Sequence, residues 1–274
     1  MNRRAFLAGA AAGMAGLTTG GTAFGLNWHS DLQSRELDGS AAPGGWPQPF
    51  GQRRLVWSVP TAAPLAALTF DDGPDSQLTP QILEVLAEHG AMATFNMMGW
   101  NATRHPGLVR AVVAAGHEVG NHTWTHLDLA RQSTSQTRRQ LDLGRQAIEA
   151  TAPVRLRWFR PPRGELTGTA VRAAAELGQD LLLWSVDRGP AGVSTPAAVA
   201  DHLARAVGPG DVVGLHDGIG RGTFDPHSTL ARQLRARRLV ELAALPAALQ
   251  RLQTRGVRLV TASELVEAAT HARP

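Results

Sequence analysis

The sequence predicts an α/β fold, an irregular (β/α)7 TIM-like barrel with its active site at the C-terminal ends of the strands. Short apolar runs alternate with amphipathic helical patterns from about residue 61 to about residue 270, which makes about seven β/α units and a parallel sheet. An open sheet would fit this alternation too, but it would spread the strand ends along a line. Six polar residues at the C-terminal ends of different predicted strands indicate that these ends meet at one rim, as in a closed barrel: Asp71, Asp72, His122, Arg160, Asp187 and His216.

Each element has a local signal in the sequence. A strand is expected over residues 65–70, where an apolar run ends at two aspartates. The next helix has Thr79 as its N-cap and Pro80 at its first helical position, and Gly90 ends it. The other elements are expected, in order, as a strand over 92–98, a helix over 106–115, a strand over 117–121, a helix over 136–150, and strands over 158–160, 180–186, 211–215 and 257–261.

The N-terminal residues predict export. The pair Arg3-Arg4 precedes Phe6-Leu7 and resembles the twin-arginine class of signals, and residues 21–23 form a small-x-small site that a signal peptidase could cut. The apolar run is too short and too rich in glycine for a membrane span, although an uncleaved anchor is an alternative. We therefore expect an export signal over 1–23, a linker over 24–60 and a catalytic domain over 61–270, in a periplasmic, cell-wall associated or extracellular protein without stable membrane insertion.

Composition excludes several kinds of site. The chain has no cysteine, so it has no disulfide, thiolate ligand or cysteine nucleophile. Its 27 basic residues are all arginine and stand against 23 acidic ones, for a formal net charge of +4. The densest basic group lacks an aromatic side chain that could stack a nucleic acid base, and we interpret it as a solvated surface: Arg232, Arg235, Arg237 and Arg238. We expect a monomer that does not bind nucleic acid.

Two short segments carry the side chains of a catalytic metal site. Asp72, His122 and His126 would supply three ligands and leave a position for water, which is typical of a catalytic zinc site. Histidines four residues apart lie on one face of a helical turn, within reach of one cation. Asp71 would remain beside the ion as a free carboxylate. Two histidines and one carboxylate also suit iron(II), so a non-haem iron oxygenase is an alternative.

Five motifs in order resemble those of polysaccharide deacetylases of the NodB-like family, carbohydrate esterase family four. The resemblance extends from about residue 62 to about residue 268. The motifs are Thr-Phe-Asp-Asp-Gly-Pro from Thr69, His-Thr-Trp-Thr-His from His122, Phe-Arg-Pro-Pro-Arg-Gly from Phe159, Trp-Ser-Val-Asp from Trp184 and Leu-His-Asp from Leu215. The family fold is an irregular (β/α) barrel, as the strand ends already predict.

The resemblance implies a role for each motif residue. Asp71 is the general base, Arg160 orients it and Asp187 supports Arg160. Asp72, His122 and His126 hold one divalent ion. Zinc is the expected ion, and cobalt and nickel are alternatives. His216 is the general acid, which suits histidine because it titrates near neutral pH. Arg163, through its backbone N–H, and Leu215 contact the substrate.

The expected activity is hydrolysis of N-acetyl groups on a glycan of N-acetylhexosamines, peptidoglycan or chitin-like. One motif departs from the family pattern. The family motif reads Asp-x-x-Asp-Trp from the Asp187 position, whereas this chain reads Asp187-Arg188-Gly189-Pro190-Ala191, so the aromatic wall of the acetyl pocket is absent from this segment. Two alternatives stay open, an O-acetyl esterase on xylan-type glycans and an inactive glycan-binding relative.

Overall fold

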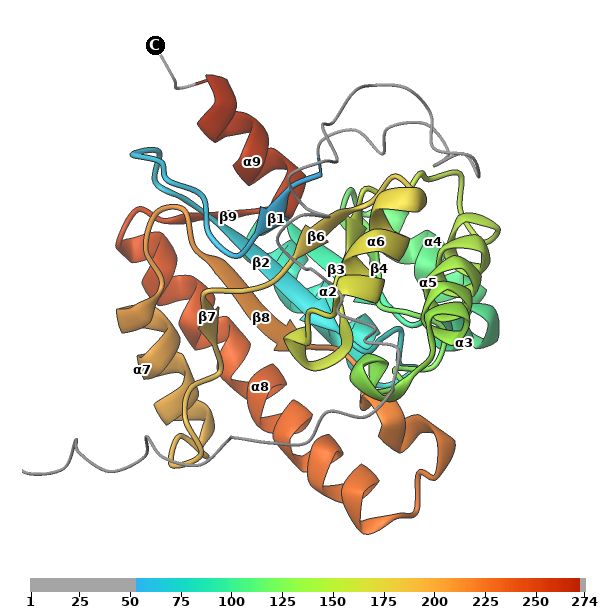
Figure 1. The fold of residues 1–274 in the computed structure, drawn as a ribbon. Coiled ribbons are helices and arrows are strands. Elements are labelled where there is room, and N and C mark those ends of the chain that lie inside the picture. Colours follow the sequence, from blue (N-terminus) through green and yellow to red (C-terminus); the bar gives the residue numbers. More distant parts are fainter. Residues whose placement is uncertain (1–52, 272–274) are drawn as a thin grey trace, which may run out of the picture. The chain divides into compact units, whose positions relative to one another are not determined.

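The computed structural model describes residues 53–271 (Figure 1). The predicted export signal and most of the predicted linker lie outside this described range. Within it, no helix is both long enough and apolar enough to cross a bilayer. Leu55 and Val56 form strand β1 (Leu55–Val56) and pair with β6 (Asp180–Leu182), so the folded domain starts before residue 61 and the predicted linker is too long at its C-terminal end.

In the described residues, nine strands form one sheet, and every strand pair in it is parallel. Its order is β1-β6-β5-β4-β3-β2-β8-β7, and β9 pairs with the start of β2. The strands not yet given are β2 (Leu65–Asp71), β3 (Ala93–Met97), β4 (Glu118–Asn121), β5 (Trp158–Phe159), β7 (Val186–Asp187), β8 (Val212–His216) and β9 (Arg258–Val260).

One irregular stretch closes the sheet into the predicted barrel. Strands β6 and β7 are two parts of residues 180–187, and this stretch pairs with β5 at one end and with β8 at the other. Between the two parts, the Ser185 N–H donates to the Val212 carbonyl at 2.9 Å. The single strand predicted over 180–186 is therefore broken, but the irregular (β/α) barrel is confirmed.

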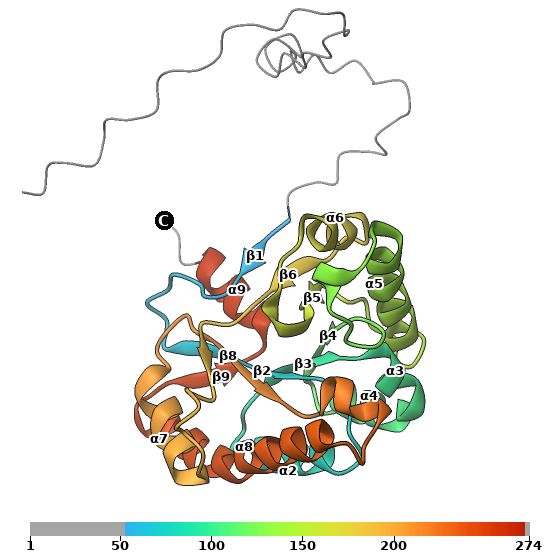
Figure 2. The same cartoon turned by 60° about the horizontal axis from the view of Figure 1, so that its bottom comes forward.

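Helices lie outside the curled sheet (Figure 2). They are α2 (Leu78–Glu88), α3 (Gly99–Arg104), α4 (Pro106–Ala114), α5 (Thr134–Glu149), α6 (Gly168–Glu176), α7 (Pro196–Ala206), α8 (Thr229–Thr254) and α9 (Ala262–His271), with short 3-10 turns η1 (Leu129–Arg131), η2 (Pro162–Gly164) and η3 (Gly220–Phe224). Two details differ from the sequence prediction. Helix α3 was not predicted, and the N-cap of α2 is Gln77 rather than Thr79, because the Thr79 hydroxyl binds the Asp217 carboxylate instead.

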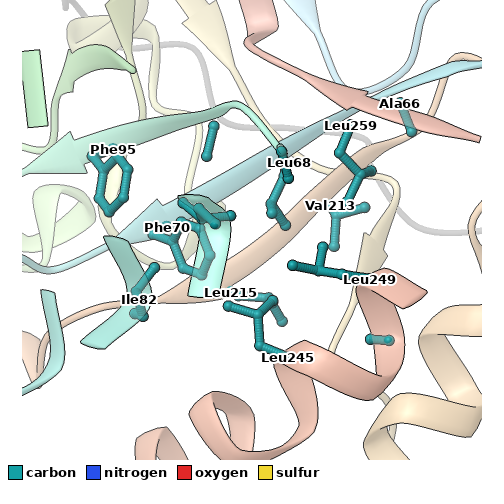
Figure 3. Close-up of a cluster of buried hydrophobic side chains, with 14 of the residues drawn as sticks. Ala66, Leu68, Phe70, Ile82, Phe95, Val213, Leu215, Leu245, Leu249 and Leu259 are labelled. Atoms are coloured by element: carbon teal, nitrogen blue, oxygen red, sulfur yellow. The ribbon is translucent and has the colours of Figure 1, made fainter. Parts of the chain in front are cut away.

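The central strand β2 is buried on both of its faces. All seven of its residues are buried. Ala66, Leu68 and Phe70 point toward the helices and pack with Ile82 of α2 and with leucines of α8, as Figure 3 shows. Side chains alternate along a strand, so Thr69 and Asp71 point to the opposite face, inside the barrel. The position of Asp71 in the site follows from this alternation.

Helix α5 packs directly on the segment that contains the predicted histidine ligands. A Cβ atom on Gly144 would lie 2.7 Å from the Thr123 carbonyl carbon and 2.5 Å from Asn121 Oδ1. Gly99 of α3 packs equally close to α5, because a Cβ atom on Gly99 would lie 2.7 Å from Gly144 Cα. The backbone approach between α5 and this segment therefore requires glycine at position 144.

We predict that Gly144→Ala lowers the free energy of unfolding by about 1–3 kcal/mol, the usual cost of overpacking, despite the higher helix propensity of alanine. Denaturant unfolding of the purified protein measures this change. Gly107→Ala is the matched control, because Gly107 lies in α4 and its Cβ would meet no atom within 4 Å. Equal stability of the two variants would contradict the tight packing.

Candidate active site and metal centre

Six of the predicted residues converge at the carboxyl ends of the barrel strands. Asp71 ends β2 and lies in register with His216, the last residue of β8. His122 follows β4, and Arg160 follows β5. Asp72 and His126 lie in the loops beyond β2 and β4. The barrel closure brings these side chains to one rim, as the prediction required.

Asp72 leaves the strand with a left-handed backbone. Its φ of 78° is uncommon for a residue with a side chain, although aspartate tolerates it better than most. Two contacts hold the turn. The Asn101 side-chain amide donates to the Asp72 carbonyl at 2.8 Å, and the Gly73 N–H donates to Asp217 Oδ1 at 3.0 Å. The turn points the Asp72 carboxylate away from Asp71, so two adjacent carboxylates face different partners.

The Asp72, His122 and His126 side chains have the spacing of a metal site. The Nε2 atoms of His122 and His126 lie 3.5 and 3.3 Å from Asp72 Oδ1. Ligands about 2.0 Å from a tetrahedral zinc are separated by about 3.3 Å, so both distances fit one ion. Asp72 Oδ1 is buried and accepts no hydrogen bond from the described residues. A cation would satisfy this orphaned oxygen, and the three residues fit the predicted divalent metal.

The two histidines come together by a route that the sequence did not predict. Residues 122–126 form a loop rather than a helical turn, with left-handed φ values of 71° at Thr123 and 55° at His126. The Thr123 hydroxyl accepts a hydrogen bond from the His126 N–H at 3.0 Å, and Gln140 of α5 accepts one from the Thr125 N–H at 2.9 Å. The loop therefore depends on α5, and the helical spacing argument was wrong.

Both imidazoles can present Nε2 as a ligand atom. His122 Nδ1 lies 2.7 Å from the Arg160 carbonyl, to which it donates, and this fixes the tautomer with a free Nε2. Burial lowers the pKa of His126 to about 4, so His126 is neutral near pH 7. The His122 pKa is raised, because Asp71 and Asp72 together outweigh the effect of its burial. A metal ion would displace any proton on its Nε2.

Asp71 is held as an ionised base. Its Oδ1 accepts hydrogen bonds from Arg160 Nη1 and from the Asn96 side-chain amide, both at 2.8 Å. Burial would raise the pKa of the Asp71 carboxyl, but the Arg160 cation, with His122 and His216, lowers it below its ordinary value. Asn96 was not among the predicted site residues. Its place in β3, in register with Asp71, is the signal that could have identified it.

Asp187 does not support Arg160 as predicted. It is exposed, and its carboxylate accepts the Gly189 N–H at 2.8 Å. Arg160 is fully buried and donates elsewhere, to the Thr69 hydroxyl and to the carbonyls of Leu182 and Leu183. The break between β6 and β7 frees these carbonyls from sheet pairing. Main-chain oxygens, rather than the Asp187 carboxylate, therefore accept the hydrogen bonds of Arg160.

Of the two predicted substrate contacts, Leu215 lies away from the pocket, and the contact of Arg163 stays a prediction. Leu215 is buried in the core, because the residue before it and His216 after it face inward and Leu215 faces the helices. It is not among the residues that line the pocket. Arg163 lies at the rim with a left-handed φ of 60°, and its guanidinium pairs with Asp128 Oδ2 at 2.7 Å.

Helix α8 contributes two residues that sequence analysis missed. Arg238 Nη2 donates to Asp72 Oδ2 at 3.2 Å, and Glu241 Oε2 lies 3.1 Å from His216 Nδ1. Arg238 is buried, and Arg235 pairs with Asp75 at 2.8 Å, so the arginine group at residues 232–238 is not simply a solvated surface. The spacing of three residues between Arg238 and Glu241 was the only local signal, and it does not identify their partners.

A pocket of about 690 Å³ opens beside Asp71 and His216. Its walls come from Trp184 before β7, from the segment after β7, which includes Arg188 and Ala191, and from α8. Gly189 and Ala191 line the pocket with little side-chain bulk. The pocket gives a ligand access to Asp71 and to His216, its register partner on the neighbouring strand.

The chain is similar to known glycan deacetylases. A family model described as polysaccharide deacetylase matches residues 58–182. A peptidoglycan-N-acetylglucosamine deacetylase of Bacillus cereus is 35% identical over 214 residues, which cover 77% of this chain and 92% of that protein. A chitooligosaccharide deacetylase of Sinorhizobium fredii is 40% identical over 168 residues, or 60% of this chain and 77% of that protein. The solved structure of a peptidoglycan N-acetylglucosamine deacetylase in complex with 4-naphthalen-1-yl-N-oxidanyl-benzamide has a TM-score of 0.68 and 28% identity, over 78% of this chain and 94% of that chain.

We predict that His126→Ala weakens the binding of a divalent metal by at least about 100-fold, because the loss of a ligand should cost more than the roughly 10–100-fold loss that follows a change in a group that only supports a ligand. Isothermal titration with zinc measures this affinity. His227→Ala is the control, because His227 is exposed and belongs to no described ligand cluster. Tight zinc binding by His126→Ala would contradict the site.

Proposed function

The chain belongs to the polysaccharide deacetylase family, and we propose that it is a metal-dependent enzyme that hydrolyses the N-acetyl groups of an N-acetylhexosamine glycan to acetate and a free amine. Peptidoglycan and chitin-like glycans are the leading substrates. The observation that carries the proposal is the meeting of three groups at one rim. An Asp-His-His set, an ionised aspartate and a partly exposed histidine lie together at the ends of β2, β4 and β8.

Two findings support this substrate class. The similar proteins of Bacillus cereus and Sinorhizobium fredii are named for peptidoglycan N-acetylglucosamine and for chitooligosaccharide. The pocket beside Asp71 and His216 has a volume of about 690 Å³, within the usual range of ligand pockets. It is also open, as a site that acts on one unit of a long polymer must be.

The side chains divide the work of amide hydrolysis. Asp72, His122 and His126 would hold a divalent ion, for which zinc is the leading candidate. Such an ion, when bound, would lower the pKa of a water molecule and polarise the acetyl carbonyl. Asp71 accepts a proton from the attacking water, since its pKa is kept below its ordinary value and it is ionised. Arg160 and Asn96 both bind Asp71 Oδ1, which leaves Oδ2 as the proton acceptor.

His216 completes the reaction from the neighbouring strand, β8. An amine is a poor leaving group, so the nitrogen must be protonated as the carbon–nitrogen bond breaks. His216 is the partly exposed histidine that lines the pocket together with Asp71, and it can donate to a group bound between them. Arg163, at the rim, is proposed to contact the substrate.

We predict that Asp71→Asn lowers the rate of acetate release from N-acetylglucosamine oligomers by about 10²–10⁴-fold, the usual contribution of a general base. Zinc binding should be retained, because Asp71 is not a ligand. His216→Ala should give a loss of similar size. Wild-type rates from either variant would exclude its assigned role.

The same acetate assay separates the other candidate functions. Purified peptidoglycan, chitin oligomers and O-acetylated xylan are compared as substrates at equal acetyl content. Release only from xylan would assign an O-acetyl esterase. Release from none of them, with binding to one, would assign an inactive glycan-binding relative and overturn the proposed hydrolysis.

The enzyme is proposed to act outside the cytoplasm, since residues 1–23 resemble an export signal and the named peptidoglycan deacetylases have cell-wall substrates. We predict that replacing Arg3 and Arg4 with lysines blocks export, because the twin-arginine pathway reads that pair. Immunoblots of cell fractions from a host with that pathway measure the location. Unchanged export would contradict the twin-arginine assignment and leave a general secretory signal.

A further inference from the structure

We infer that Glu241 of α8 is a positioning residue for His216, and that its buried carboxylate orients the imidazole and holds the proton on Nδ1. This inference rests on the proposed role of His216 as the acid that protonates the leaving amine. Neither the motifs nor the predicted roles include Glu241, which lies 25 residues after His216 in the sequence.

The contact is specific for one ring nitrogen. His216 Nδ1 lies 3.1 Å from Glu241 Oε2, within hydrogen-bond distance. A carboxylate can only accept, so Nδ1 carries the proton and Nε2 is the atom left to act toward a ligand. His216 lines the pocket together with Asp71. The contact therefore selects the tautomer and the ring orientation that a general acid at this place requires.

Glu241 is held as an anion in a nearly closed environment. Its side chain is 2% exposed, against 29% for His216. Arg238 Nη1 and Arg188 Nε lie 3.3 and 3.4 Å from Glu241 Oε1, so its other oxygen remains for His216. Burial would raise the pKa of Glu241, but His216, Arg238 and Arg188 hold it below its ordinary value.

The other charged groups around His216 come from four elements. They are Asp71 and Asp72 at the end of β2, Asp187 and Arg188 at the end of β7, Asp217 after β8, and Arg237 and Arg238 on α8. Of all these groups and Glu241, only Glu241 has a hydrogen bond to the His216 ring in the described structure.

Asp187 is the competing candidate, because it lines the same pocket. Its carboxylate is exposed and turned back on its own loop, where it accepts the Gly189 N–H. Glu241 of helix α8 therefore contacts the His216 ring, whereas Asp187 of the motif has no hydrogen bond to it in the described structure.

The test is Glu241→Gln, which keeps the side-chain shape and removes the charge. We expect the alkaline limb of the kcat–pH profile, where the acid loses its proton, to move to lower pH. Glu241→Asp should restore part of this shift, which a packing defect would not explain.

Two control variants accompany this test. Glu118→Gln removes another hydrogen-bonded carboxylate, which binds Trp158 and Ser263 rather than a site residue, and should leave the kcat–pH profile unchanged. Asp187→Asn should leave the shape of the profile unchanged as well. A shift of the alkaline limb with Asp187→Asn but not with Glu241→Gln would overturn the inference.

The wild-type protein supplies a measurement that needs no variant. Nitrogen-15 NMR of neutral His216 should show the Nδ1–H tautomer, and a dominant Nε2–H tautomer would overturn the inference even if Glu241→Gln fails to fold. Failure of the proposed function gives a different result. The Nδ1–H tautomer of His216 would then be observed while the wild type releases no acetate from any glycan.

Discussion

Two adjacent aspartates are buried at the end of the central strand, and the rest of the site exists to balance their charge. A buried carboxylate is costly unless cations or donors surround it. Asp71 has Arg160 and Asn96, whereas Asp72 has Arg238 and the two imidazoles. The left-handed turn at Asp72 keeps the two carboxylates apart and lets them do different work.

The irregular closure of the barrel supplies part of this balance. A regular strand over 180–187 would use its carbonyls in sheet pairing. The break between β6 and β7 instead gives the carbonyls of Leu182 and Leu183 to Arg160. The Arg160 carbonyl in turn accepts a hydrogen bond from His122 Nδ1, so one residue links Asp71 to His122.

Helix α8 links Asp72 to His216. Arg238 binds the outer oxygen of Asp72, and Glu241 binds His216. The two residues also pair with each other at 3.3 Å, three positions apart on one helix face. The metal ligand and the histidine thus share a rigid support, and this favours a fixed geometry between them.

The sequence by itself determined the barrel, the strand-end positions of Asp71 and His216, and the Asp-His-His set, because alternation and residue spacing are local properties. It could not determine how the histidines meet, since their loop relies on Gly144 and Gln140 of α5. The sequence also could not determine which side chains face the core, the solvent or the site. Leu215 packs in the core, Asp187 faces solvent, and Glu241 and Arg238 enter the site from a distant helix. Only the tertiary structure decided these placements, because each one depends on contacts between segments far apart in the chain, where local pattern carries no information.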